Sequence, residues 1–338
     1  MDPCMQRALM FVGAFIGAGF ASGREVVSFF SRYGACSWGL ILLSAGTMTA
    51  LCALCLRSAK AANGCQWCAI YREDSFAVRN LAEGCILLLQ IIMGGSMISA
   101  SGHIFALIFP VKHAYLLGTG VTIAIAVLIS GANLKPMTVL SSLLAVLFVM
   151  AVVGVLIFDG NDSQMIVLPR IDDGHIIEGA FRSVAYAALN LALSIGMICR
   201  CGGCSCRSSN RSAVLFGLML TGLLLVSNYL YLKHPEVQSV TFPMVSLLAR
   251  FGRVGYMVSL SLMYLAIVTT LSAGLYALRA GLEVHGTKAT ALWLTVLLPL
   301  AVSFAGFENL VDRWYGMAGL LCLLLVFLPL FIRQENLS

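Results

Sequence analysis

Residues 13–27 read GAFIGAGFASGREVV and interrupt an apolar stretch that is otherwise typical of a membrane helix. Four glycines fall within eleven residues: Gly13, Gly17, Gly19 and Gly23. Each interior glycine costs a helix about 1 kcal/mol relative to alanine, and the charges of Arg24 and Glu25, which follow at once, are costly in lipid. Close packing of two helices through small residues would explain the glycines but not the charges. An unwound turn that lines a polar cavity explains both features.

The composition predicts a polytopic membrane protein. The chain has 338 residues, of which 60% are hydrophobic and 11% are charged, and its mean hydropathy is +0.94. A soluble domain cannot bury so much apolar side chain. The net charge of +6 does not indicate a nucleic-acid partner, because the basic residues are scattered singly between apolar segments and form no patch.

Ten apolar segments are long enough to cross a hydrocarbon core, which takes about 20 residues each. They show no alternation of period two, so the sequence predicts helices rather than a barrel. The predicted spans are 7–32, 38–57, 79–109, 115–132, 136–158, 178–199, 212–232, 254–283, 289–306 and 314–333.

Lysine and arginine predict the orientation, since cytoplasmic loops carry an excess of them. With both termini in the cytoplasm, twelve basic residues lie inside and eight outside, and Arg24 lies within the membrane. The largest predicted outer loop, 161–177, divides the chain into 1–160 and 178–338, with five spans each. The first span of each half is interrupted, by GAFIGAGFASG and by AYAALNLALSIG. Since five is odd, the second half is inverted, and matched interruptions in inverted repeats indicate a transporter's binding site.

Two cysteine pairs, CQWC and CGGC, stand apart from the single cysteines Cys36, Cys85 and Cys322, which we interpret as small apolar fillers. Both pairs fall in predicted cytoplasmic loops, where structural disulfides are not expected. Together they could form a four-cysteine zinc or iron–sulfur site, although the spacing between the pairs is unlike that of a zinc finger. The candidate metal ligands are Cys65, Cys68, Cys201 and Cys204.

The stretch FVGAFIGAGFASGREVVSFF resembles the first helix of the YkvI-like membrane proteins, whose hallmark is a G-A-G-F-A-S-G-x-E run. This family is similar to a branch of the amino acid–polyamine–organocation superfamily, which has the leucine-transporter fold. The resemblance implies an all-α protein of about ten helices, built as a 5+5 inverted repeat with helices 1 and 6 broken, in a bacterial plasma membrane. One position departs from the family: residue 24 is arginine where a neutral polar residue is expected.

The resemblance implies that backbone N–H groups of the helix 1 turn hold a substrate carboxylate, and that the facing segment of helix 6 is 186–194. Asn190 lies near the middle of that segment and either bonds the broken backbone or contacts substrate. Ser96 and Ser99 of the third span complete the wall. The expected substrate-binding residues are Gly17, Ala18, Gly19, Phe20, Ser22, Gly23, Ser96, Tyr186, Asn190 and Ser194.

A sodium site between helices 1 and 8 is common in this fold, and AIVTT at 266–270 resembles its helix 8 pattern. The alternative is that the threonines bond back to carbonyls one turn earlier. The residues carried over are the carbonyls of Gly13, Ile16 and Ala266 and the hydroxyls of Thr269 and Thr270. Arg24 and Glu25 are candidates for coupling or gating, and Glu25 leaves a proton route open. Span 136–158 contains no lysine that could replace sodium.

The leading hypothesis is therefore a secondary transporter of an amino acid or similar small zwitterion, coupled to sodium or protons. The alternative is a sensor with the same fold that binds a small molecule without net flux. We expect no enzyme activity, because the five histidines are dispersed and no nucleophile lies beside a base. No ATP-binding loop is present, which argues against primary transport by this chain.

Overall fold

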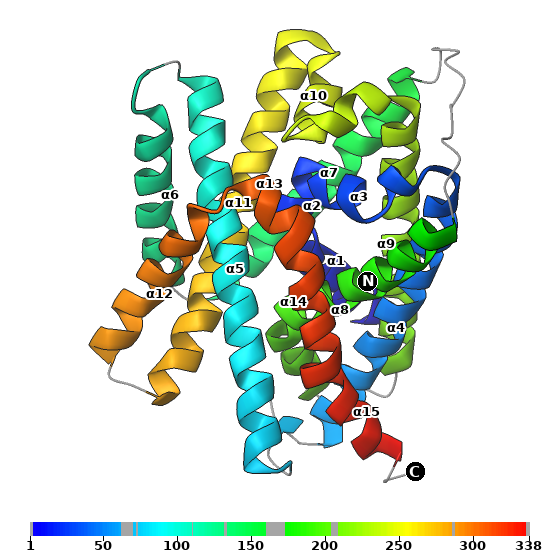
Figure 1. The fold of residues 1–338 in the computed structure, drawn as a ribbon, viewed down its shortest axis with the longest axis vertical. Helices are drawn as coiled ribbons and strands as arrows, with labels where there is room; N and C mark the ends of the chain where they lie inside the picture. The colour runs from blue at the N-terminus through cyan, green and yellow to red at the C-terminus, as the bar shows by residue number, and fades with distance from the viewer. Residues whose placement is uncertain are drawn as a thin grey trace.

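A computed structural model describes residues 3–61, 70–71, 74–109, 111–131, 134–159, 173–203, 209–285 and 288–335. These residues form an array of helices, most of which run along the long axis of the molecule (Figure 1). The helix α10 marks one end of the array and the C-terminal α15 the other. We refer to these ends as the α10 side and the α15 side.

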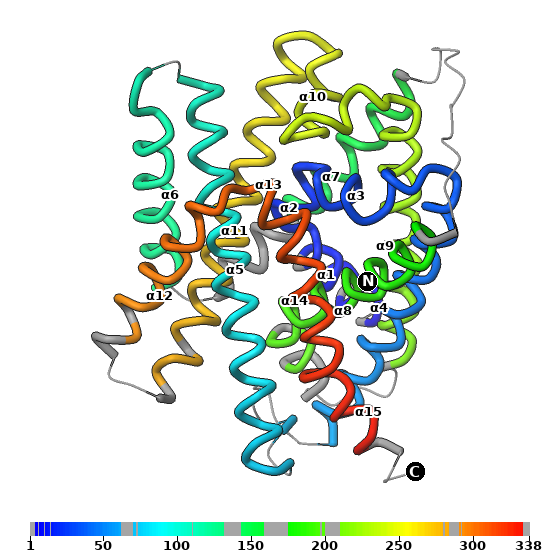
Figure 2. The backbone as a smooth tube through the Cα atoms, viewed as in Figure 1, coloured from blue at the N-terminus to red at the C-terminus, as the bar shows by residue number. Residues whose placement is uncertain are grey.

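The first predicted span is three short helices, and the next four are single helices. The helices of the first span are α1 (Pro3–Phe15), α2 (Ala18–Ser22) and α3 (Arg24–Phe29), followed by the 3-10 helix η1 (Ser31–Cys36). The single helices are α4 (Ser37–Ala61), α5 (Phe76–Ile108), α6 (Ala114–Ser130) and α7 (Leu134–Asp159). The backbone of the first span runs from α1 through α2 and α3, beneath α10 in the view of Figure 2.

The second half begins with α8 (Asp173–Gly203) and α9 (Ser209–Lys233). The 3-10 helix η3 (Pro235–Ser239) and α10 (Pro243–Ala249) connect α9 to α11 (Gly252–His285), which is followed by α12 (Lys288–Ser303). The last span contains two π-helical turns, and its segments are α13 (Phe307–Asn309), η4 (Leu310–Trp314), α14 (Tyr315–Cys322), η5 (Leu323–Phe327) and α15 (Leu328–Glu335).

Each of the ten predicted spans thus coincides with a helix or a row of short helices. Within the described residues, six helices are long and apolar enough to cross a membrane by length and composition. Three shorter apolar helices lie in α6, α7 and α12, and the broken first span is the tenth segment. The outward faces are apolar, as lipid requires: Leu128, Phe158, Val254 and Phe304 are each more than 70% exposed.

The break predicted in helix 6 is wrong, because α8 continues as one helix from Asp173 to Gly203. The sequence AYAALNLAL that suggested a break consists of good helix formers apart from its tyrosine and Asn190. The Asn190 amide donates to the Tyr186 carbonyl one turn earlier, at 3.0 Å. The asparagine therefore satisfies its amide within the helix instead of marking an unwound turn.

The helices pack in two groups (Figure 1). In the first group α4 lies against α8 and α9, and α1 contacts α8 and α9 as well. In the second group α5 packs against α6, α11 and α12, and α11 contacts α6 and α12. Each group therefore takes two consecutive spans from each half of the chain. The short helix α2, just after the break, contacts α11 and so touches the second group.

Candidate functional site

The first span breaks at Ile16 and Gly17, which lie between α1 and α2 and are not helical. The Gly17 N–H donates to Phe15 O at 2.7 Å rather than to the Gly13 carbonyl one turn earlier. The first backbone bond of the new helix runs from Ala21 N to Gly17 O, at 2.9 Å. The break therefore frees a carbonyl at the end of α1 and places the first N–H groups of α2 beside it.

A second bend follows at Gly23, where φ is +82°. A side chain there would also overlap the Tyr231 hydroxyl and approach Met244 N at 3.1 Å. The Ser22 hydroxyl supports the bend, because it donates to Gly19 O at 2.6 Å and accepts from Arg24 N at 3.1 Å. Ser22 is fully buried, and its only donor is used by the backbone, so it holds the turn.

We expect Gly23→Ala to lower the free energy of unfolding by about 2–4 kcal/mol, because it combines a left-handed residue with a steric overlap. Gly252→Ala is the matched control, since Gly252 has a φ of +78° with open space around it. The control isolates the backbone cost, about 1–2 kcal/mol. Thermal unfolding in detergent compares the two variants. Equal losses would show that the contact with Tyr231 contributes nothing.

The second residue of α2, Gly19, lies against the side chain of Glu25. A methyl group added to Gly19 would overlap the Glu25 carboxylate. Glu25 is only 6% exposed. The buried Tyr186 hydroxyl of α8 lies beside this carboxylate, and it makes no other hydrogen bond to a described residue. Glu25, considered from the sequence as a coupling residue, thus lies among the predicted substrate-binding residues.

Tyr315 of α14 forms another part of the same wall. Its hydroxyl is hydrogen-bonded to the hydroxyl of Ser96 on α5, and Tyr315 lies near Glu25. Ser96 also donates to Met93 O at 2.8 Å. Gly94 and Gly95, next to Ser96, allow α12 to approach, since a side chain on Gly95 would meet Val302. The structure therefore joins Gly19, Glu25, Tyr186, Tyr315 and Ser96 around one buried region, which we call the central site.

Several other predicted substrate-binding residues contact neighbouring protein groups. Phe20 is 1% exposed and packs against the rings of Phe15 and Phe148 at 5.5 and 5.4 Å. Ala18 is fully buried. Ser99 contacts the hydroxyl of Tyr115 on α6, at 3.3 Å. The partly exposed Ser194 is eight residues beyond Tyr186 on α8, and Asn190 bonds its own helix.

The residues predicted to hold sodium lie partly together. Gly17 and Thr270 of α11 are neighbours, since a methyl group on Gly17 would lie 3.2 Å from Thr270 Oγ1. The Thr270 hydroxyl makes no hydrogen bond within the described part of the chain. The Thr269 hydroxyl bonds back to the carbonyls of Leu265 and Ala266, each at 3.0 Å. The back-bonding alternative therefore describes Thr269, and Thr270 faces the break.

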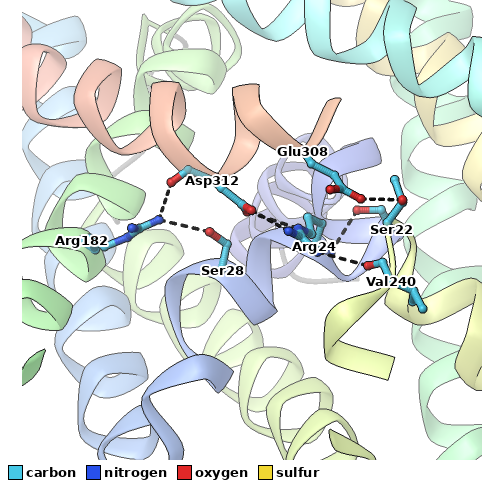
Figure 3. A network of polar contacts seen from close by, with 8 residues as sticks. Ser22, Arg24, Ser28, Arg182, Val240, Glu308 and Asp312 are labelled. Carbon is cyan, nitrogen blue, oxygen red and sulfur yellow. Dashed lines mark hydrogen bonds and ion pairs between the residues drawn. The ribbon is translucent and has the colours of Figure 1, made fainter. Parts of the chain in front are cut away.

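Arg24 lies in a polar network that includes Asp312, Arg182 and Val240 (Figure 3). Its Nε and Nη2 donate to the two carboxylate oxygens of Asp312 at 3.2 and 2.5 Å, and its Nη1 donates to Val240 O at 3.2 Å. The Arg24 side chain is 13% exposed and that of Asp312 is 31% exposed. Bidentate ion pairs between arginine and carboxylate are among the stronger side-chain contacts.

Asp312 also binds a second arginine, through its backbone. Arg182 of α8 donates to Asp312 O at 2.7 Å and to Ser28 Oγ at 3.1 Å. Nearby, Thr241 donates to Glu308 of α13 at 2.5 Å. The network therefore ties α3, α8, the segment before α10 and the last span together above the break (Figure 3).

Four site residues are not predicted from the sequence: Asp312, Arg182, Tyr315 and Asn228. Asn228 of α9 accepts from Ser31 and donates to Ser37, both at 2.8 Å, and anchors the chain that follows the broken helix. A signal was present in part, because Arg182 and Asp312 are charges near the predicted outer ends of spans 6 and 10. Which charges face one another depends on how distant spans pack, and local sequence does not encode it.

The predicted cysteine metal site falls outside the part of the chain that the structure describes. Cys65, Cys68 and Cys204 lie outside the described residues, and the side chain of Cys201 does too. Within the described ranges no group of three or more potential metal ligands gathers. Two of the predicted fillers, Cys85 on α5 and Cys322 on α14, are buried with their sulfur atoms 3.4 Å apart.

A pocket of about 320 Å³ lies on the α10 side rather than at the break. It is bounded by α5, the segment before α10 and the start of α11, with His103, Phe242 and Tyr256 in its lining. Val240 and Thr241 line it and also belong to the polar network. The pocket therefore adjoins the polar network.

Comparisons with known proteins agree with this architecture. No model of a known protein family matches the chain. The chain is 25% identical, over 329 residues, to the uncharacterized membrane protein YkvI of Bacillus subtilis (strain 168), covering 93% of this chain and 91% of that protein. This likeness confirms the predicted resemblance to YkvI-like membrane proteins.

The crystal structure of MhsT in complex with L-phenylalanine matches with a TM-score of 0.66 and 14% identity, over 94% of this chain and 87% of that one. That match shows that the chain has the leucine-transporter fold.

Proposed function

We propose that this protein is a secondary active transporter of an amino acid or similar small zwitterion, coupled to sodium or protons and working by alternating access. The observation that carries the proposal is the break at Gly17 in the middle of the fold. Broken helices are tolerated in membranes where they line a binding cavity. MhsT, which has a similar fold, was crystallised with L-phenylalanine, and this supports an amino acid as the class of substrate.

The substrate's carboxylate would bind at the start of α2. The N–H groups of Ala18 and Gly19 precede the first α2 bond, which starts at Ala21, and the positive end of a helix favours an anion. The N–H of Gly17 bonds Phe15 O, so we assign the carboxylate to Ala18 and Gly19. Ser96, Tyr186 and Tyr315 would enclose the rest of the molecule.

Sodium would bind on the other side of the break. The carbonyl of Gly13 is released from the helix by the Gly17–Phe15 bond, and Thr270 Oγ1 faces Gly17. Oxygen ligands of this kind suit a hard cation. Ile16, Ala266 and Thr269 complete the proposed ligand set, with Thr269 donating its proton to Ala266 O and keeping a lone pair for the ion.

We expect Thr270→Val to raise the sodium concentration for half-maximal binding by about tenfold, because it keeps the side-chain shape and removes one ligand. Thr270→Ser keeps the hydroxyl and should restore most of the affinity. The measurement is the sodium dependence of thermal stability in the presence of substrate. An unchanged sodium response in the valine variant would remove Thr270 from the site.

Arg24 and the network around Asp312 would form the outer gate. We assign the α10 side to the exterior and both termini to the cytoplasm of a bacterial cell, in agreement with the excess of basic residues inside. The helix group of α1, α4, α8 and α9 would rock against the group of α5, α6, α11 and α12 about the central site. The halves 1–160 and 178–338 would then be the two inverted repeats.

The binding part of the proposal is tested by the thermal stability of the purified protein against a panel of amino acids, with and without sodium. A ligand that binds only the folded state raises its apparent stability. We expect one or a few amino acids to do so, and more strongly with sodium. If no amino acid shifts the unfolding temperature in either salt, the substrate class is wrong.

A further inference from the structure

The central site holds an acidic side chain, Glu25, that is part of neither the proposed carboxylate position nor the proposed sodium ligand set. The Glu25 carboxylate fills the space beside Gly19, and Glu25 is 6% exposed. It lies on the first turn of α3, one residue beyond Arg24. The two neighbours point to different places: Arg24 into the outer network and Glu25 into the interior.

Glu25 lacks a positively charged partner among the residues that the structure describes. Arg24 is occupied by Asp312 and Val240. In the described part of the chain, no lysine, arginine or histidine pairs with the Glu25 carboxylate. A buried carboxylate without a positive partner is costly in a membrane protein. The carboxylate is neutralised either by a proton or by a cation that enters the site.

The surroundings of Glu25 suit an organic ammonium ion. The ring of Tyr186 lies 5.0, 5.1 and 6.0 Å from those of Phe29, Phe30 and Phe15. Aromatic rings attract ammonium groups, and an apolar wall strengthens an ion pair. The buried Tyr186 hydroxyl lies beside the Glu25 carboxylate and makes no other hydrogen bond to a described residue, so both groups can contact the same ligand.

A metal ion is the weaker candidate at this position. The oxygen set proposed for sodium lies at the end of α1 and on α11, where Thr270 is a neighbour of Gly17. Gly19, two residues further, contacts Glu25 instead. The two positions for positive charge are thus separate, and the phenylalanine rings around Tyr186 favour an organic ammonium ion over a hard metal ion.

We propose that Glu25 is the counter-ion of the substrate's ammonium group, so that a charged amine is the part of the substrate the site requires. This inference rests on the proposed transport function, which it deepens. The carboxylate of an amino acid binds the N–H groups at the start of α2, and its ammonium group binds Glu25. An amine without a carboxylate retains the second contact, whereas an acid without an amine faces Glu25 with a like charge.

The test compares three matched probes on the purified full-length protein: L-phenylalanine, 2-phenylethylamine and 3-phenylpropionate. The same comparison is made with L-leucine, 3-methylbutylamine and 4-methylpentanoate. Binding is measured by thermal shift and by calorimetry. In the wild type we expect the amino acid to bind best, the amine to bind more weakly and the acid not to bind.

Glu25→Gln keeps the shape and removes the charge. We expect it to weaken amino acid and amine binding by about tenfold or more and to abolish the preference for amine over acid. Glu25→Asp should keep that preference. Glu236→Gln is the control, because it removes an exposed carboxylate in η3. It should change neither the affinity for amino acids and amines nor the preference for amine over acid.

The failures are distinguishable. If amino acids bind and Glu25→Gln leaves affinity and preference unchanged, the counter-ion role is overturned and the proposed function stands. If only amines bind, the counter-ion role is supported and the amino acid substrate is wrong. If neither amino acids nor amines bind the wild type, both proposals are overturned.

Discussion

Gly19→Leu is expected to weaken substrate binding by about 100-fold or more, an energetic loss of about 3 kcal/mol. Even a methyl group on Gly19 would overlap the Glu25 carboxylate. A leucine must therefore displace Glu25 or close the space beside it, and either movement removes the central site. The measurement is calorimetric titration of the purified variant with the amino acid that stabilises the wild type.

Gly222→Leu is the matched control for Gly19→Leu. Gly222 lies in the middle of α9, is exposed, and has no atom within 4 Å of where its side chain would stand. The control should insert, unfold and bind like the wild type. If Gly19→Leu is well folded and keeps wild-type affinity, the substrate does not bind beside α2.

Breaking the Arg24–Asp312 pair is expected to have the second-largest effect. Arg24→Gln and Asp312→Asn should each reduce uptake by about tenfold or more, because each leaves a partly buried charge without its partner. Uptake by the double variant should be no lower than uptake by the less active of the two single variants, since both changes remove the same contact. Uptake into vesicles and the rate of ligand release measure the effect.

Arg313→Gln provides the control for the network. Arg313 follows Asp312 directly but is exposed, so its loss should leave uptake near that of the wild type. Additive losses in the double variant would mean that Arg24 and Asp312 act independently. In that case the contact between them is not the gate.

The break in helix 1 could be predicted because its cause is local. Glycines at 17, 19 and 23 weaken the helix by themselves, and the structure places non-helical backbone at Gly17 and a left-handed residue at Gly23. The ten spans were predictable for a similar reason, since hydrophobic length alone decides which segments can cross a membrane.

Symmetry with helix 1 predicts a break in helix 6, and this prediction is wrong because local helix propensity outweighs that symmetry. Alanine and leucine keep α8 helical, and Asn190 bonds within it. The partners of Arg24 could not be found from sequence, since Asp312 lies 288 residues away. The position of the Glu25 side chain could not be predicted from sequence either. Adjacent residues on a helix point in different directions, but the sequence does not say which groups each one contacts.

The central claim is that the break at Gly17 forms a binding site that carries a small zwitterion across the membrane by alternating access. The most direct test reconstitutes the purified protein in sealed vesicles and follows radiolabelled L-phenylalanine and L-leucine under an imposed sodium or proton gradient. The account predicts accumulation above the external concentration that collapses when an ionophore dissipates the driving gradient. Binding of an amino acid without any flux under either gradient would contradict it and would identify the protein as a sensor with a transporter's fold.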